Sequence, residues 1–358
     1  LFAAGANNAM TMLGAAIHSI ERRLWQQETR RRTHPFAWGL DCLGGGEGEA
    51  RAFLQRYAEQ ALAQSDDFFA SGPAEWYQLD GEPARPAGEL LTFPSALQSL
   101  YPENNLVYGR VFRARGEAAN GRRPKRAVVV LPQWNAQPES HVNICRVLAF
   151  FGITAVRLSL PYHDERKPAG LERADYMVSP NVGLTIQASR QAVLDARRTV
   201  RWLTQQGYER LGILGTSIGS AVAFITLAHE PALRAGVFLH VSTYFADVVR
   251  MGMTTSHVWA GLEGQVTADE LRHYWAPISP YPYVPKLKGA GKKLLLVSGR
   301  YDLSFPFELT QQLWRALDEH EVAHEKLVLP CGHYTLGRLP FSYWAGLRFV
   351  PFLRRALS

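Results

Sequence analysis

The sequence has few cysteines and no long apolar run, which excludes several classes of protein. Its three cysteines, Cys42, Cys145 and Cys331, form no CxxC pair, so neither a disulfide framework nor a structural zinc site is expected. No run reaches the roughly 18 apolar residues of a membrane-spanning helix. The first residues lack the basic-then-apolar pattern of an intact signal peptide. These gaps favour a cytoplasmic protein, although a start at Leu1 leaves open that an upstream segment is missing.

Motifs for metals, cofactors and nucleic acids are also missing. The chain has no HExxH and no carboxylate-rich loop, so we predict no metal and no cofactor. Gly44-Gly45-Gly46 lacks the Lys-Ser/Thr of a phosphate-binding loop, and we interpret it as a linker. The formal charge of +7 comes partly from basic runs at 22–32 and 122–126. Neither run interleaves aromatic residues, so we expect no nucleic-acid partner.

The first 86 residues are predicted to form a helical extension. Apolar residues recur every three or four positions along one stripe, at Met10, Leu13, Ile17, Ile20 and Leu24. A second helical stretch covers about 48–64, and the prolines and glycine at 83–88 mark a boundary. We expect the stripe to pack on the rest of the protein or on a second copy, which would make a homo-oligomer. Peripheral contact with a membrane is the less favoured reading.

From residue 87 to 358 the pattern changes to alternating strands and helices. Short runs rich in β-branched and other apolar residues, such as 126–131, 153–160, 211–214 and 293–297, are separated by longer helical segments. This alternation predicts an α/β protein with a mostly parallel sheet of eight strands, flanked by helices. An aromatic-rich stretch at about 243–285 interrupts the rhythm and predicts a small cap. In such sheets the chemistry gathers at the carboxyl ends of strands.

A nucleophile motif follows one of these strands. Gly215-Thr216-Ser217-Ile218-Gly219 lies between the apolar run 211–214 and a helical run that begins at Ile218. The order strand, GxSxG, helix is the context in which a serine projects from a sharp turn. The turn would place the Ser217 hydroxyl at a helix N-terminus, where free N–H groups stabilise negative charge. We therefore predict Ser217 as a nucleophile.

A serine nucleophile needs a base and an orienting carboxylate, and two later strand ends supply them. Asp302 follows the run 293–297, and His333 follows the run 326–329. The order Ser, Asp, His is the one expected for this arrangement of strands. Asp247 and Glu308 are rival acids. His163-Asp164 precedes the serine, so we interpret that pair as loop structure or pocket wall.

Three segments, GTSIG, SGRYDLSFP and LPCGHYTLG, resemble the nucleophile, acid and histidine segments of α/β-hydrolases. Ile278-Ser279-Pro280 ahead of the acid strand is similar too. The resemblance covers about residues 90 to 358, and in motif style it is closest to the dienelactone hydrolase and acetyl xylan esterase branch of serine esterases. It implies the α/β-hydrolase fold and a Ser217-His333-Asp302 triad.

In this fold the oxyanion hole uses the amide after the nucleophile and one from the loop after the third strand. Those positions are Ile218 and Gln133 or Trp134. The chain departs from many relatives here, because it has Pro132-Gln133 where they carry His-Gly. For the substrate pocket we predict aromatic and apolar residues from the loops and the cap, which favour a hydrophobic ester over a highly charged one: Tyr162, Tyr244, Met251, Trp259 and Phe305.

The predicted function is hydrolysis of a small-molecule carboxylic ester through an acyl-enzyme. Acyl transfer and peptide or amide hydrolysis use the same triad, and the sequence does not separate them. A third reading is a non-catalytic, hydrolase-like module whose N-terminal helix binds a partner or a membrane.

Overall fold

A nine-stranded sheet forms the centre of the protein in the computed structural model, which describes residues 2–46, 48–81, 87–116 and 125–358. The strands are β1 (Gln78–Asp80), β2 (Glu89–Pro94), β3 (Leu106–Phe112), β4 (Lys125–Leu131), β5 (Thr154–Leu158), β6 (Tyr208–Thr216), β7 (Leu233–Leu239), β8 (Lys293–Gly299) and β9 (His324–Leu329). Their order across the sheet is β1-β2-β3-β5-β4-β6-β7-β8-β9. Pairing is parallel from β5 to β9 and antiparallel among β1, β2, β3 and β5. The predicted fold class is confirmed, with nine strands instead of eight.

β1 lies in the segment for which only helices were predicted. It has three residues, none of them buried, and pairs along one side with β2. A strand this short and exposed produces no apolar alternation, so the sequence carried no signal for it.

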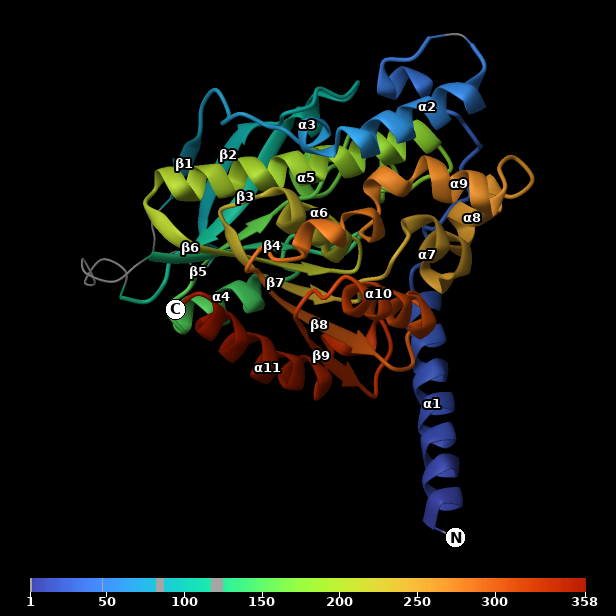
Figure 1. The fold of residues 1–358 in the computed structure, drawn as a ribbon, viewed down its shortest axis with the longest axis vertical. Coiled ribbons are helices and arrows are strands. Elements are labelled where there is room, and N and C mark those ends of the chain that lie inside the picture. The colour runs from blue at the N-terminus through green and yellow to red at the C-terminus, as the bar shows by residue number, and fades with distance from the viewer. Residues whose placement is uncertain (1, 47, 82–86, 117–124) are drawn as a thin grey trace.

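Helices cover both faces of the sheet (Figure 1). They are α1 (Phe2–Gln26), α2 (Ala50–Ala63), α3 (Ser65–Phe68), α4 (Val142–Phe150), α5 (Val182–Gln205), α6 (Ile218–His229), α7 (Phe245–Met251), α8 (Ser256–Leu262), α9 (Ala268–Tyr274), α10 (Phe307–Glu319) and α11 (Phe341–Ala356). Alternate residues of the central strands enter two cores: Val129 packs with α5, α6 and α10, and Val128 packs with α4 and α11. Burial on both faces explains why β4 is a continuous apolar run.

The N-terminal extension packs on the rest of the chain. Leu54 of α2 and Phe69 after α3 are fully buried in the core that also contains α5 and α6. Gly39 is in the left-handed region, with φ 62°, and a Cβ there would lie 1.8 Å from Oδ1 of Asn181, the residue that caps α5. The extension therefore shares a hydrophobic core with the sheet. Residues 82–86, which precede the boundary predicted at residues 86 and 87, and residues 122–124 of the basic run at 122–126 lie outside the described residues.

α1 leaves the body along its first turns and contacts it along its second half (Figure 1). Its buried residues are Gly14, Ile17 and Glu21, spaced three and four apart, whereas Leu13 and Ile20 are exposed. The predicted stripe was therefore wrong for these two residues, because the buried face lies one position further round the helix and includes a carboxylate. The side chain of Met10 lies outside the described ones.

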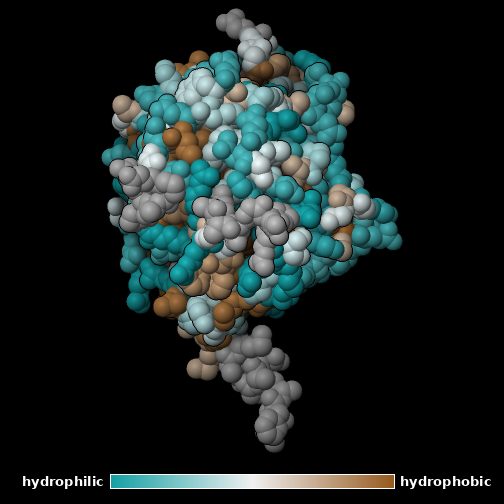
Figure 2. Space-filling model, turned by 90° about the vertical axis from the view of Figure 1, so that its left-hand side faces the viewer, coloured by the Kyte–Doolittle hydropathy of each residue, from teal (hydrophilic) through white to brown (hydrophobic). Residues whose placement is uncertain are grey.

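The surface has exposed apolar residues on two neighbouring helices. Figure 2 shows a mostly hydrophilic face with hydrophobic side chains gathered toward its lower end. Large exposed apolar residues lie on α4 and α11: Val147, Phe150, Tyr343, Trp344 and Leu347. In the part of the chain that the structure describes, no helix is both long and apolar enough to cross a membrane. Membrane contact and self-association remain predictions.

The order of the strands creates a crevice at the carboxyl ends of two neighbouring central strands, β4 and β6. The chain runs from β4 to β5 on one side of β4, then crosses through α5 to β6 on the other side. The carboxyl ends of β4 and β6 therefore diverge into connections on opposite sides, which is where open α/β sheets bind ligands. Ser217 follows β6, and Gln133 and Trp134 follow β4.

Candidate active site

Ser217 lies on a strained turn between β6 and α6. Its backbone has φ 56° and ψ −123°, a combination rare for residues other than glycine. The Ser217 amide donates to the Leu239 carbonyl of β7 at 2.8 Å, and its carbonyl accepts from the Ser220 hydroxyl at 2.6 Å. These contacts hold the strained turn between two strands and a helix.

Both glycines of the motif are required by close packing. A Cβ at Gly215 would lie 2.1 Å from the Gly219 carbonyl oxygen, and a Cβ at Gly219 would lie 2.4 Å from the Pro132 carbonyl oxygen. The second contact brings the start of α6 against the end of β4. Ile218 and the Gln133-Trp134 segment are therefore neighbours, as the predicted oxyanion hole needs.

The structure brings the three predicted triad residues together. His333 Nε2 lies 3.1 Å from Ser217 Oγ, and His333 Nδ1 lies 3.0 Å from Asp302 Oδ2. They follow β6, β8 and β9, so residues up to 116 positions apart meet at one edge of the sheet. The Nδ1 proton donates to the carboxylate, which leaves Nε2 with a lone pair toward the serine.

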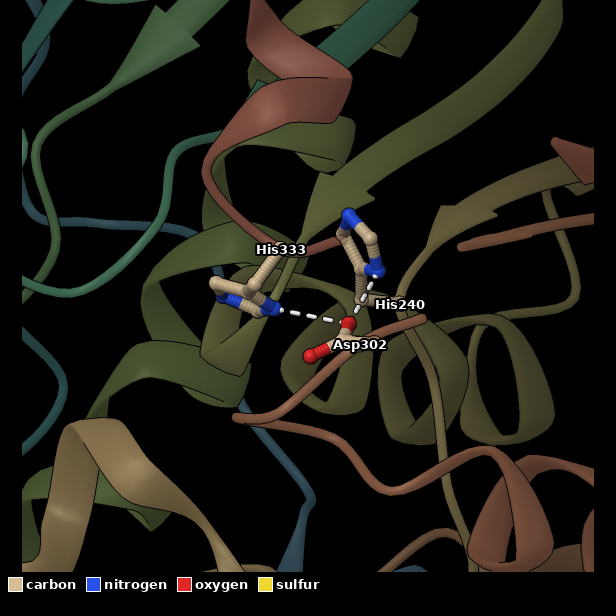
Figure 3. A group of neighbouring side chains, drawn as sticks. All are labelled: His240, Asp302 and His333. Atoms are coloured by element: carbon tan, nitrogen blue, oxygen red, sulfur yellow. Dashed lines mark hydrogen bonds and ion pairs between the residues drawn. The ribbon is translucent and has the colours of Figure 1, made fainter. Parts of the chain in front are cut away.

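Asp302 is 6% exposed and accepts four hydrogen bonds. Oδ1 accepts from the amides of Ser304 and Phe305, both at 2.7 Å. Oδ2 accepts from His333 and also from Nδ1 of His240, at 2.6 Å (Figure 3). Burial alone would raise the pKa of Asp302, but the two histidines outweigh it and hold the pKa below its ordinary value. The carboxylate is therefore ionised and fixed in orientation.

The charge of Asp302 also acts on His333. Burial lowers the pKa of His333, but the adjacent carboxylate and its hydrogen bond outweigh burial, so the pKa lies above the ordinary value. A base with a raised pKa accepts the serine proton more readily.

The rival acids lie elsewhere. Asp247 forms a two-oxygen ion pair with Arg272, at 2.9 Å, and Glu308 is exposed on α10. Asp164 pairs with Arg157 at 2.7 Å. His163 accepts from the Asn135 amide at 2.9 Å, which makes it a support of the loop after β4.

A cavity of about 610 Å³ opens beside Ser217. Ile218, Gln133 and Trp134 all line it, together with His333. The indole N–H of Trp134 donates to the Ala174 carbonyl at 2.8 Å, and its ring stacks on His257. The apolar part of the lining comes from several elements: Ile144, Phe245, Val248, Phe305, Leu336 and Phe349.

Of the five predicted substrate residues, only Phe305 lines this cavity. Tyr162 is fully buried against Tyr101 and Tyr176. Tyr244 packs on Tyr281, and Met251 is exposed at the end of α7. The structure does not bring Trp259 to the cavity either, since it packs against the main core. Aromatic content in the predicted cap did not reveal which side chains face the serine.

One group of residues has the composition of a metal site. Among the described residues, His240, Asp302 and His333 offer ligand atoms within 4.8 Å of one another. Both Nδ1 atoms carry protons that donate to Oδ2. We therefore interpret the group as a hydrogen-bonded network.

Known proteins match this chain in sequence over one segment and in fold over most of its length. Residues 187–335, which contain all three triad positions, match the prolyl oligopeptidase family. Sequence comparison with curated proteins found no match. Acetyl xylan esterase 1 from Thermoanaerobacterium sp. has a similar structure, with a TM-score of 0.59, 13% identity, and coverage of 83% of this chain and 93% of the esterase.

Two peptidases are similar in structure as well. Acylaminoacyl peptidase from Pyrococcus horikoshii has a TM-score of 0.55 and 13% identity, covering 78% of this chain and 42% of the peptidase. A puromycin-hydrolyzing peptidase from Mycobacterium tuberculosis has a TM-score of 0.57 and 15% identity, covering 79% of this chain and 46% of the peptidase. This chain thus spans less than half the length of both peptidases.

The chain has the α/β-hydrolase fold. The family match and the structural neighbours support a serine hydrolase of the α/β-hydrolase type. Proteins of similar fold include acetyl xylan esterases and a dienelactone hydrolase, the branch that the three motif segments resemble.

The N-terminal extension of this α/β-hydrolase fold reaches the loop that follows β9 and carries His333, which we call the histidine loop. Glu21 of α1 is fully buried and accepts from the amides of Tyr334 and Thr335, at 3.0 and 2.9 Å. It also accepts from the Thr335 hydroxyl at 2.9 Å. Arg31 donates to the Tyr334 hydroxyl at 3.3 Å and lines the cavity. The sequence did carry one signal for this role, a carboxylate on the apolar face of a helix, which needs a buried partner.

We predict that Glu21→Ala lowers kcat by about 100-fold, because small displacements of a catalytic group have effects of this size. The change removes the acceptor for three donors of the histidine loop. Each buried donor left without a partner costs about 1–3 kcal/mol, so the melting temperature should fall as well. Arg22→Ala, an exposed change one position along α1, is the matched control. Parent-like turnover by Glu21→Ala would show that the loop holds His333 without α1.

Proposed function

We propose that this chain hydrolyses carboxylic esters with a hydrophobic moiety through an acyl-enzyme on Ser217. The hydrogen-bonded chain Ser217-His333-Asp302 carries the proposal. The reaction requires an ionised carboxylate, a Nδ1–H toward it and a free Nε2 toward the serine, and the distances between the three groups fit that arrangement.

In the proposed reaction, Nε2 of His333 takes the proton of Ser217 as Oγ attacks the ester carbonyl carbon. The tetrahedral oxyanion accepts hydrogen bonds from the Ile218 amide and from that of Gln133 or Trp134. His333 then gives its proton to the departing alcohol, which leaves the acyl group on Ser217. Water activated by His333 releases the acid and restores the serine.

The share of each similar protein's length that this chain matches favours an ester over a peptide substrate. The chain matches acetyl xylan esterases over more than nine-tenths of their length but the peptidases over less than half. The apolar lining of the cavity favours a hydrophobic acyl or alcohol group. Charged residues, Glu28, Arg31 and Arg173, also line the cavity, and Arg173 lies 3.4 Å from Glu28 in an ion pair.

The family match keeps amide hydrolysis as a second candidate. A p-nitrophenyl ester and a p-nitroanilide with the same acyl group compare the two activities directly. We expect measurable turnover of the ester and a value of kcat/KM for the anilide lower by several orders of magnitude. Anilide turnover at a similar kcat/KM would replace the esterase proposal with a peptidase or amidase. Added alcohols and amines test acyl transfer through new ester or amide products.

A fluorophosphonate probe tests the nucleophile itself. Ser217 Oγ should displace fluoride from phosphorus, adding one probe group to the peptide that contains residues 215–219. We expect Ser217→Ala to abolish labelling and Ser256→Ala, a change of an exposed serine on α8, to leave it intact. Undiminished labelling of Ser217→Ala would overturn the proposed function.

A further inference from the structure

His240 is a buried histidine beside the triad. It directly follows β7, is 2% exposed, and has φ 60°, a region that residues other than glycine adopt uncommonly and histidine somewhat more often than most. Its amide donates to the Val297 carbonyl of β8 at 2.9 Å. Its carbonyl lies 2.8 Å from the Ser220 hydroxyl of α6, whose single proton it shares with the Ser217 carbonyl. These two contacts hold the backbone of His240 beside the end of β8, where the loop that carries Asp302 begins.

The ring makes the shorter of the two histidine contacts to Asp302. Nδ1 of His240 lies 2.6 Å from Oδ2, compared with 3.0 Å for Nδ1 of His333. The two rings flank the same carboxylate oxygen, with centroids 4.5 Å apart (Figure 3). Nε2 of His240 is buried and has no partner among the described residues. A strained backbone and an unsatisfied nitrogen both destabilise the fold, so filling space does not account for a histidine here.

We propose that His240 is a positioning residue: by donating to the Asp302 oxygen that also accepts from His333, it holds the carboxylate in place and limits how strongly it acts on the catalytic base. The inference rests on the proposed function, because it assigns a role in activating Ser217. His240 also lines the cavity beside Ser217, but its ring is bonded to Asp302, and among the described residues it is His333 that hydrogen-bonds to the serine.

The charged and titratable groups around the two rings determine in which direction the loss of His240 shifts the pKa of His333. Burial lowers the pKa of His240, which therefore acts as a neutral donor near pH 7. Asp302 and Glu21 face both rings, and the neighbouring Cys331 thiol has a pKa raised by burial, so it stays neutral. Without the His240 donor, Oδ2 would accept more strongly from His333 and raise its pKa. The neutral base would then exist only at higher pH.

Two substitutions of matched shape separate donation from packing. In His240→Asn, the amide nitrogen is attached to Cγ as Nδ1 is, so it can donate to Oδ2, and asparagine tolerates a positive φ. His240→Leu has the same branching at Cγ but no donor. The rate of fluorophosphonate labelling of Ser217, measured from about pH 5 to 9, reports the fraction of neutral His333 without requiring a known substrate.

We expect His240→Leu to label up to about tenfold more slowly at pH 7, with the acidic midpoint raised by about one pH unit. His240→Asn should keep the parent midpoint and label within about threefold of the parent. An unshifted midpoint in His240→Leu, or a shifted one in His240→Asn, would overturn the inference. His240→Asn alone decides the question if the leucine variant does not fold. This test presupposes that Ser217→Ala is not labelled. If Ser217→Ala is labelled, the proposed function is rejected and not the role of His240.

Discussion

His333→Ala is expected to lower kcat for ester hydrolysis by about 10⁶-fold, the size of effect seen when a triad loses its base. In the structure no other described histidine nitrogen lies within hydrogen-bonding distance of Ser217 Oγ. His240 is nearby, but its Nδ1 donates to Asp302 and its backbone is fixed by β8 and α6. The serine would therefore keep its proton, and only binding and the oxyanion hole would accelerate the reaction.

Steady-state kinetics with a p-nitrophenyl ester measures this loss. KM should change little, because the substrate would still contact the same cavity. His320→Ala is the matched control: His320 follows α10 just before β9 starts, at the opposite edge of the sheet from His333. A His333→Ala variant that retains more than about a tenth of parental kcat would mean that another group activates the serine.

Asp302→Asn is expected to lower kcat at neutral pH by about 10⁴-fold, although the side chain barely changes in size. The reason is that the substitution changes which nitrogen of His333 carries the proton. The Asn oxygen would accept from the amides of Ser304 and Phe305, as Oδ1 of Asp302 does. Its NH₂ group would then face Nδ1 of His333 and force the proton onto Nε2. A histidine protonated at Nε2 cannot take the proton of Ser217.

The opposite amide orientation does not rescue the enzyme. The NH₂ group would then face two backbone N–H donors and leave them without acceptors. Kinetics and thermal melting distinguish this variant from a general loss of structure, since we expect kcat to fall far more than the folded fraction. Asp318→Asn, on the exposed end of α10, is the control. A loss below about tenfold would show that Asp302 does not determine the tautomer of His333.

Local patterns were enough to predict that Ser217, Asp302 and His333 lie together, because each follows an apolar strand and the carboxyl ends of parallel strands meet at one edge of the sheet. The same logic placed Ile218, Gln133 and Trp134 beside Ser217, where they line the cavity. A close approach of Gly219 to the end of β4 brings these segments together. Strand type and the requirement for small residues in the serine turn are determined by short stretches of sequence.

The cavity lining was less predictable. Tyr162, Tyr244, Met251 and Trp259 belong to aromatic and apolar segments, yet none of them lines the cavity beside Ser217. An aromatic side chain in a loop packs equally well against a core or a ligand, and only the path of the backbone decides between them. Phe305 is the exception because it lies three residues after Asp302 and its amide donates to that carboxylate.

The sequence by itself determined the alternation of strands and helices, the strained serine turn, and the order of the triad along the chain. These features depend on residues close together in the chain, and their periodicity or spacing is visible in the sequence. Tertiary structure alone decided that Glu21 of the N-terminal helix holds the histidine loop and that His240 shares the Asp302 oxygen. Both contacts join segments that are distant along the chain, where burial and hydrogen bonding depend on the packed fold rather than on local pattern.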